Sequence, residues 1–251
     1  MIDFHTHALP HMDDGAAHEN LTKEMLEEAK KQGVTTVLLT SHYYGKRKSP
    51  AQFLEKREAA YERLKSVAPE GMEFRQAAEV HFRGDSVVSF EDVCKLNIEG
   101  TRYVLIELSF TSKWLRNLPE KLADFIAETG YVPVLAHAER YEEFAKDPKR
   151  LFEFVSMGCL VQVNADAFLE RKTRSMAFAM LRHGLVHCIG TDMHNLEDRP
   201  PNMAAAKAAI EAAGEGEAFE RLQENMRRIL DNKPVRVQAT PMKKCLFGKY
   251  F

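Results

Sequence analysis

Residues 4–15 read FHTHALPHMDDG and hold three histidines and two aspartates within 12 positions. The apolar start at 1–5 predicts a short β-strand, and the charged run from residue 19 predicts a helix, so the cluster lies where a strand passes into a loop. Residues i and i+2 of a strand point to the same face, so His5 and His7 can both face one cavity. The stretch is therefore either a set of metal ligands or a polar turn rich in histidine, and the rest of the chain decides between the two.

Short apolar runs alternate with helical segments along the whole chain. The predicted strands are 1–5, 35–40, 73–79, 103–108, 131–137, 159–164 and 185–192. Most are continuous apolar runs, which is typical of parallel strands covered on both faces. The predicted helices are 19–32, one opening at Pro50, one from Pro119 to Gly130, one from Pro148 to Gly158, 174–183, and one after Pro201. Seven βα units without a repeat or linker predict one α/β domain over residues 1–251, with a parallel barrel favoured over an open sheet.

The composition is that of an ordinary globular protein, with 45% hydrophobic and 29% charged residues and a formal net charge of −2. This balance gives no reason to expect nucleic-acid or membrane binding. No apolar run approaches the roughly 20 residues that span a bilayer, and no export signal is visible, so we expect a cytoplasmic protein. The four cysteines are far apart and none has an arginine six positions later. Their spacing argues against a disulfide framework, a cysteine zinc site and the Cys-x5-Arg loop of cysteine-based phosphatases.

The ends of the predicted strands carry the chemistry. In parallel barrels the functional side chains gather where strands end and βα loops begin. Six of the seven predicted strand ends bear a histidine or a carboxylate, and the sixth strand ends in Asn164 instead. The candidate ligands are His5, His7, His42, Glu79, Glu107, His137, Asp192 and His194, and Asp13 or Asp14 could add a ninth.

This donor set predicts a multinuclear metal site. All the donors are nitrogen or oxygen, which suits Mn²⁺, Fe or Zn²⁺ without separating them. Nine side chains exceed what one ion takes, so two or three ions bridged by carboxylates are expected. Sites of this kind serve the hydrolysis of phosphoesters or amides. Arg140 and Arg199 follow His137 and His194 in the loops at the same end, and guanidinium groups suit bidentate phosphate contacts, so a phosphate substrate is favoured.

Nine sequence blocks carry a family resemblance. They are DFHTH (3–7), MDDG (12–15), TSHYYG (40–45), AAEV (77–80), LIELS (105–109), AHAERY (136–141), MGCLVQVN (157–164), GTDMHNLEDRPP (190–201) and ENMRRILDNKP (224–234). On these motifs the chain resembles the polymerase and histidinol phosphatase (PHP) family. Within it, the chain is similar to the bacterial tyrosine phosphatases encoded with capsule and exopolysaccharide genes. The resemblance covers nearly the whole chain, although His11 stands where it implies an acidic residue.

The resemblance implies a distorted (β/α)7 TIM-like barrel that holds two or three divalent ions, manganese first and iron or zinc as alternatives. The implied metal ligands are His5, His7, Asp14, His42, Glu79, Glu107, His137, Asp192 and His194. Glu79 and Glu107 would bridge metals. We expect Arg140, Arg199 and Asp192 to act in catalysis.

The expected reaction is hydrolysis of phosphotyrosine by a hydroxide that bridges the metals, on a protein substrate such as a bacterial tyrosine kinase that regulates capsule or exopolysaccharide synthesis. Side chains of two loops could receive the phosphotyrosine segment or form ordinary polar loops, namely Tyr43, Tyr44, Lys46, Arg47, Lys48, Trp114 and Arg116.

Three alternatives stay open. One is a small-molecule phosphatase such as a histidinol phosphatase, and another is a non-catalytic, metal-dependent binding module. The third is a metal-dependent amidohydrolase, but it would want a lysine and a histidine where this chain has Glu107 and Asn164. The tail from Gln238 is interpreted either as a docked terminus or as a contact with a partner. The protein could also form a homo-oligomer.

Overall fold

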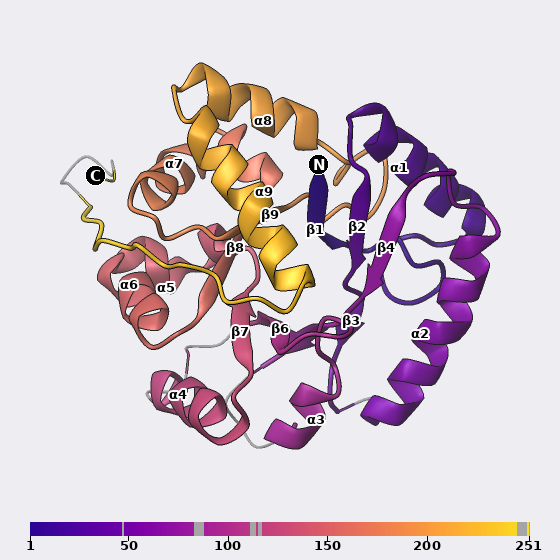
Figure 1. The fold of residues 1–251 in the computed structure, drawn as a ribbon, viewed down its shortest axis with the longest axis horizontal. Coiled ribbons are helices and arrows are strands. Elements are labelled where there is room, and N and C mark those ends of the chain that lie inside the picture. Colours follow the sequence, from indigo (N-terminus) through magenta and orange to yellow (C-terminus); the bar gives the residue numbers. More distant parts are fainter. Residues whose placement is uncertain (47, 83–87, 111–113, 115–116, 245–249, 251) are drawn as a thin grey trace.

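Parallel β-strands form the centre of the fold, and helices lie outside them (Figure 1). The structure, a computed structural model, describes residues 1–46, 48–82, 88–110, 114, 117–244 and 250. One three-stranded sheet has the order β1 (Ile2–Thr6), β2 (Thr36–Leu39), β4 (Glu73–Gln76). A six-stranded sheet has the order β3 (His42–Tyr43), β5 (Glu79–His81), β6 (Tyr103–Glu107), β7 (Val132–Leu135), β8 (Leu160–Asn164), β9 (Cys188–Gly190).

The chain passes from the first sheet to the second at two places, between β2 and β3 and between β4 and β5. The single strand predicted at 73–79 is wrong, because the chain forms β4, then Ala77 and Ala78, and then β5. The strand beside it in the sheet is interrupted at the same level, between β2 and β3. At the break the Glu79 N–H donates to the carbonyls of Thr40 and Ser41, 3.1 Å away in each case. Apolar patterning misses the break because the residues on both sides of it are buried.

The curled layer brings its first and last strands together. The Asp192 N–H donates to the His5 carbonyl (2.7 Å), and the His7 N–H donates to the Met193 carbonyl (3.0 Å). The buried Asp3 carboxylate accepts from both the N–H (2.8 Å) and the hydroxyl (2.6 Å) of Thr191. The segments around residues 3–7 and 191–193 therefore meet beside the ligand motifs HTH and DMH.

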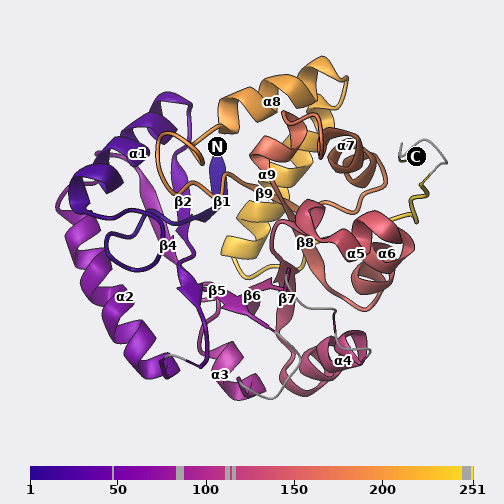
Figure 2. The ribbon, with the colours of Figure 1, turned by 180° about the vertical axis from the view of Figure 1, so that it is seen from behind.

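Helices surround the strands in both views (Figures 1 and 2). They are α1 (Glu19–Lys31), α2 (Pro50–Lys65), α3 (Phe90–Cys94), α4 (Leu118–Thr129), α5 (Glu142–Lys146), α6 (Lys149–Ser156), α7 (Arg174–Arg182), α8 (Met203–Ala212) and α9 (Gly216–Leu230). Helix α9 packs on β1 and β9, and its Gln223 side chain accepts the Ile2 N–H at 2.7 Å. The predicted helices are confirmed. Helices α3 and α5 were not predicted, because each has only 5 residues, which are too few for a periodic signal.

Local sequence explains several helix ends. Ser49 and Gln52 form a reciprocal capping box at the start of α2, where Pro50 opens the helix. Gly130 ends α4 in the left-handed conformation with φ of 70°. No helix in the ranges described above is long and apolar enough to cross a bilayer.

The tail packs along the body of the protein as far as it is described. The Thr240 N–H donates to the His183 carbonyl (2.9 Å), and Lys244 Nζ donates to the Ala145 carbonyl (2.8 Å). These contacts fit the docked-terminus interpretation. Cys245, Phe247, Lys249 and Phe251 lie outside the described residues.

The junction of β1 and β9 requires a glycine at position 190. A Cβ at Gly190 would lie 2.5 Å from the Cβ of His5 and 2.6 Å from its backbone nitrogen. Because this contact is with backbone, we expect Gly190→Ala to lower the free energy of unfolding by about 3 kcal/mol. Urea unfolding followed by circular dichroism measures it. The control is Gly216→Ala in α9, where the nearest atom is a flexible Glu211 side chain at 3.6 Å, and equal stability of the two variants would contradict the proposed tight junction.

Candidate metal centre

The predicted ligands converge at the carboxyl ends of the strands. His5 lies in β1, His42 opens β3, Glu79 opens β5 and Glu107 ends β6, while the other members follow strand ends in loops. Seven are buried: His5, His7, Glu79, Glu107, His137, Asp192 and His194. The His42 side chain is 11% exposed and that of Asp14 is 67% exposed, so the cluster is open to solvent on the side of these two residues.

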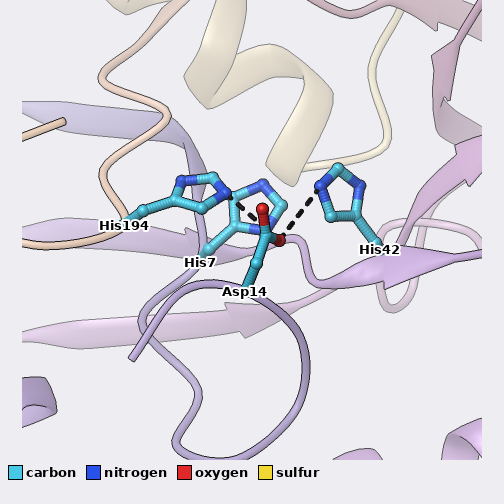
Figure 3. Close-up of side chains that lie close together, drawn as sticks. All are labelled: His7, Asp14, His42 and His194. Atoms are coloured by element: carbon cyan, nitrogen blue, oxygen red, sulfur yellow. Dashed lines mark ion pairs between the residues drawn. The ribbon is translucent and has the colours of Figure 1, made fainter. Parts of the chain in front are cut away.

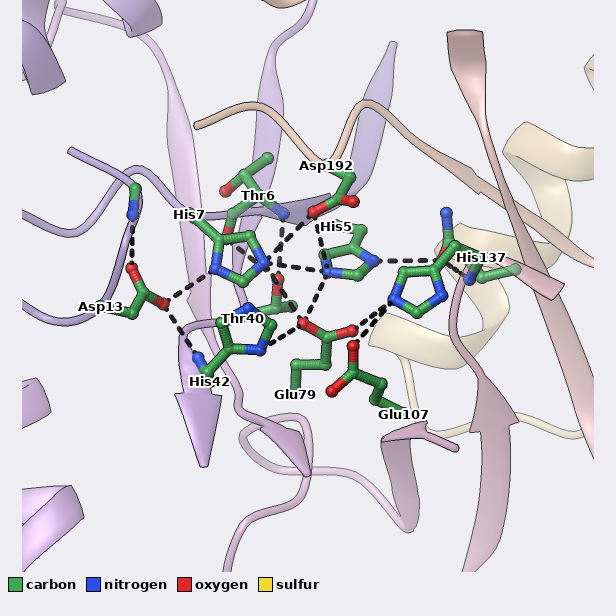
Figure 4. A network of polar contacts seen from close by, with 12 residues as sticks. His5, Thr6, His7, Asp13, Thr40, His42, Glu79, Glu107, His137 and Asp192 are labelled. Atoms are coloured by element: carbon green, nitrogen blue, oxygen red, sulfur yellow. Dashed lines mark hydrogen bonds and ion pairs between the residues drawn. The ribbon is translucent and has the colours of Figure 1, made fainter. Parts of the chain in front are cut away.

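Glu79 lies at the centre of the cluster (Figure 4). Its Oε2 is 3.3 Å from Nε2 of both His5 and His7. The same oxygen is 2.9 Å from Nδ1 of His42, and Oε1 is 2.8 Å from Nε2 of His137. A carboxylate that faces four imidazoles on two sides has the geometry of a bridging metal ligand.

Asp192 divides its two oxygens between the cluster and the arginines. Its Oδ1 lies 3.5 Å from His5 Nε2 and 3.3 Å from His7 Nε2. Its Oδ2 accepts from Arg140 Nη1 (3.2 Å) and from Arg199 Nη2. Asn164 Nδ2 also donates to this oxygen (3.0 Å), which gives the polar end of β8 a supporting role.

The backbone is strained at two of these positions. His137 has φ of 33° and Asp192 has φ of 55°, and they are two of the four described non-glycine residues with positive φ. Side chains with a Cβ adopt this region at a cost of about 1–3 kcal/mol, and they do so mainly at functional sites. The strain turns both side chains toward the cluster.

The two aspartates of the first loop have different roles. Asp13 Oδ2 accepts from His7 Nδ1 (2.8 Å) and from the His42 N–H (2.9 Å), so it orients His7 and leaves Nε2 facing the cluster. Asp14 Oδ1 instead lies 3.5 Å from His42 Nε2 and 3.6 Å from His194 Nε2 (Figure 3). Asp14 thus joins the potential ligands, as the family resemblance implied.

Two further residues orient ligands: sequence reasoning missed Gln162, and it disfavoured a pocket-facing position for His81, two residues after Glu79. Gln162 Oε1 accepts from His5 Nδ1 (3.1 Å) and from the His137 N–H (2.7 Å). His81 Nδ1 contacts Glu107 Oε2 at 3.0 Å. The alternation of Gln162 with Asn164 on β8 was the available signal, because two polar residues at i and i+2 of a buried strand share an inward face.

The side chains present fit divalent cations. Three groups bring potential ligand atoms within 4.8 Å of one another, namely His7–Asp14–His42–His194, His5–His7–Asp192 and His42–Glu79–Glu107. Asp192 Oδ1 and His194 Nε2 are buried without a hydrogen-bond partner. Buried carboxylates without partners are costly, and cations at these positions would satisfy them.

The electrostatics keep the carboxylates ionised. Burial alone would raise the pKa of Glu79, but the facing His5 charge and hydrogen bonds from His137 and His42 hold this pKa well below its usual range. Asp192 behaves in the same way, with His5 and His7 outweighing burial to lower its pKa. Burial, reinforced by the His7 charge, lowers the pKa of His194 to about 3, so this imidazole is neutral and its Nε2 lone pair is available to a metal.

The predicted substrate loops divide into two kinds. Tyr43 and Trp114 pack against the body, with the Tyr43 ring edge-on to Phe53 (5.4 Å) and the Trp114 ring edge-on to Phe144 (5.0 Å). Lys46 and Lys48 are exposed, and Tyr44 remains 39% exposed. Arg47 and Arg116 lie outside the described residues.

The central position of Glu79 predicts the effect of removing its charge. We expect Glu79→Gln to lose at least one equivalent of bound metal, because a neutral amide cannot bridge two cations as a carboxylate does. Elemental analysis after loading with Mn²⁺ and gel filtration measures the stoichiometry. Glu217→Gln, at a side chain 99% exposed on α9, is the matched control and should bind as much metal as the wild-type protein does. Full metal content in Glu79→Gln would rule out the bridging role.

Comparison with known proteins identifies the family of this chain. The family model described as capsular polysaccharide synthesis, CpsB/CapC, matches residues 1–231. The tyrosine-protein phosphatase CpsB of Streptococcus pneumoniae is 33% identical over 245 residues, covering 92% of this chain and 98% of the relative.

Solved structures agree with this assignment. A crystal structure from a study of YwqE from Bacillus subtilis and CpsB from Streptococcus pneumoniae, described as metal-dependent tyrosine phosphatases, matches with a TM-score of 0.85 and 27% identity, covering 97% of this chain and 100% of that one. The β-aspartyl dipeptidase of Fervidobacterium islandicum AW-1 matches with a TM-score of 0.60 at 16% identity, over 96% of this chain and 78% of its own, which shows a shared fold alone. The chain belongs to the CpsB/CapC family of capsular polysaccharide synthesis proteins.

Proposed function

We propose that this protein is a metal-dependent protein tyrosine phosphatase that acts on phosphotyrosine proteins of capsule or exopolysaccharide synthesis, a bacterial tyrosine kinase among them. The observation that carries the proposal is the pairing of two arginines with Asp192 at the edge of the buried cluster, 3.2 Å away for Arg140 Nη1. Relatives of the same length are named tyrosine-protein phosphatases, which supports the substrate class.

The arginines would bind the phosphate. Their side chains are 43% (Arg140) and 34% (Arg199) exposed, so each guanidinium can reach a phosphate that arrives from solvent. Because both donate to one Asp192 oxygen, they are held side by side and can present their remaining N–H groups to non-bridging phosphoryl oxygens. In the transition state these donors stabilise the charge that develops on those oxygens.

The metal cluster would supply the rest of the chemistry. The residues that would hold divalent ions are His5, His7, Asp14, His42, Glu79, Glu107, His137, Asp192 and His194. When bound, such ions would lower the pKa of water and polarise phosphoryl oxygens. Two or three ions are proposed, with manganese first and iron or zinc as alternatives. A phenolate, with a pKa of about 10, leaves readily, so the site needs no strong acid to protonate it.

The architecture supports the same proposal. We interpret the curled parallel layer, with β1 bonded to the segment after β9, as a distorted (β/α)7 TIM-like barrel that forms one domain over 1–251. The protein is proposed to work in the cytoplasm, as a monomer or a homo-oligomer. The amidohydrolase alternative is disfavoured, because Glu107 and Asn164 stand where it wants a lysine and a histidine.

Substrate preference tests the proposal directly. We expect the Mn²⁺-loaded protein to hydrolyse a phosphotyrosine peptide with a kcat/KM at least about 100-fold above that for histidinol phosphate, because the phenolate is the better leaving group. A phosphoserine peptide of identical sequence is the control for peptide binding. Preference for histidinol phosphate would identify a small-molecule phosphatase, and absence of hydrolysis with metal bound would favour a binding module.

The arginines provide a second test. We expect Arg140→Lys and Arg199→Lys each to lower kcat by about 10²–10³-fold, because lysine keeps the charge but loses the planar fork of donors. Metal content should stay unchanged. Arg171→Lys, a surface arginine near α7, is the matched control and should retain full kcat. Unchanged kcat in both site variants would remove the arginines from the reaction.

A further inference from the structure

Large apolar side chains are exposed mainly in loops at the same end of the strands as the metal cluster. Within the described ranges they are Tyr44, Phe110, Leu169, Leu196 and Val237, each 37% to 43% exposed. All except Val237 lie in loops that follow the carboxyl ends of strands, after β3, β6, β8 and β9. Exposed apolar groups that collect around a polar site mark a surface that binds a ligand with an apolar part.

Tyr44 lies at one end of the cluster. Its ring centroid is 5.2 Å from that of the ligand His42 and 5.5 Å from that of His81. It also lines a cavity of about 390 Å³ that reaches Asp14 and His42.

Phe110 lies at the other end. Its ring centroid is 5.1 Å from that of His137, and it stacks on Tyr141 at 5.0 Å with an interplanar angle of 21°. The Arg140 guanidinium carbon lies 4.9 Å from the Phe110 ring centroid. Tyr141 is itself buried and accepts the Leu108 N–H at 2.8 Å, so Phe110 rests on a fixed base next to a proposed phosphate-binding arginine.

The two aromatic residues flank the metal-binding carboxylates. Figure 4 shows His42 and His137 at opposite ends of the cluster, with Glu79 and Glu107 between them. Strands β3, β5 and β6 are neighbours, so the bases of the two loops are separated by two strand spacings, about 10 Å. Aromatic partners lie about 4.5–7 Å apart, so this span admits one further ring between Tyr44 and Phe110.

We propose that Tyr44 and Phe110 hold the aryl ring of the phosphorylated side chain between them and so determine the preference for aryl over alkyl phosphates. This specificity role rests on the proposed phosphatase function. With the ring between them, the phosphate points down toward the metal ligands and sideways to Arg140. An alkyl phosphate reaches the same arginines and metal ligands but gains nothing from the two rings.

Two non-hydrolysable probes separate ring binding from phosphate binding. Phenylphosphonate and methylphosphonate carry the same charged group, and only the first has a ring. We measure their inhibition constants against phosphopeptide hydrolysis by the Mn²⁺-loaded protein. The ratio of the methylphosphonate constant to the phenylphosphonate constant reports the contribution of the ring.

We expect Tyr44→Ala and Phe110→Ala each to lower this ratio by roughly three- to tenfold, with the methylphosphonate constant and the metal content unchanged. Tyr44→Phe and Phe110→Tyr keep a ring and should keep the ratio. Val237→Ala, an equally exposed side chain in the tail, is the matched control.

The outcomes are distinct from a failure of the phosphatase proposal. If both alanine variants leave the ratio unchanged, or weaken the two phosphonates equally, the aryl-binding role is wrong even though hydrolysis persists. If the unchanged protein hydrolyses no phosphopeptide, the proposed function fails first. Direct titration of the two phosphonates by calorimetry then still measures the ratio, and an unchanged ratio there also overturns the inference.

Discussion

The position of one carboxylate governs the arrangement of this site. Glu79 is fully buried, and its two oxygens face imidazoles that come from β1, β3 and the loop after β7. A charge in that position is tolerated only when cations or donors surround it. The break between β4 and β5 serves this requirement, because it starts a new strand at Glu79 and turns this side chain toward ligands from three other segments. The irregularity of the sheet is thus the means by which a buried anion reaches its partners.

Asp192 links the candidate metal cluster to the two arginines that we propose bind phosphate. One carboxylate oxygen faces His5 and His7, and the other holds both arginines and Asn164. The ligand histidines and the guanidinium groups therefore contact the two oxygens of one carboxylate. In the proposed reaction this arrangement would hold the metal ligands and the arginines at a fixed separation, as in-line transfer of a phosphoryl group requires.

Much of the site was predictable because the potential metal ligands lie at the carboxyl ends of the strands. His5 and His7, and Asp192 and His194, repeat the spacing of residues that share a strand face, and the structure brings both pairs into one cluster. The choice between Asp13 and Asp14 could not come from spacing, because both lie in a loop whose path depends on contacts with His7 and His42. Gln162 and Phe110 were missed, and His81 was disfavoured, for a similar reason: each acts through a neighbour from another strand, and one-dimensional patterns carry no information on such pairs. The break at Ala77 and Ala78 was hidden because burial continues through it.

The bonds between β1 and the segment after β9 have a consequence for synthesis of the protein. Asp3 and Thr191 are 188 residues apart in sequence, yet their contact holds the two halves of the ligand set together. A ribosome that adds 5–20 residues per second needs roughly 10–40 s to make the intervening chain. During that interval His5 and His7 have emerged without Asp192 and His194, so the nascent protein carries only part of its ligand set. Because the first and last strands both contribute ligands, a complete metal site can form only after most of the chain has been synthesised.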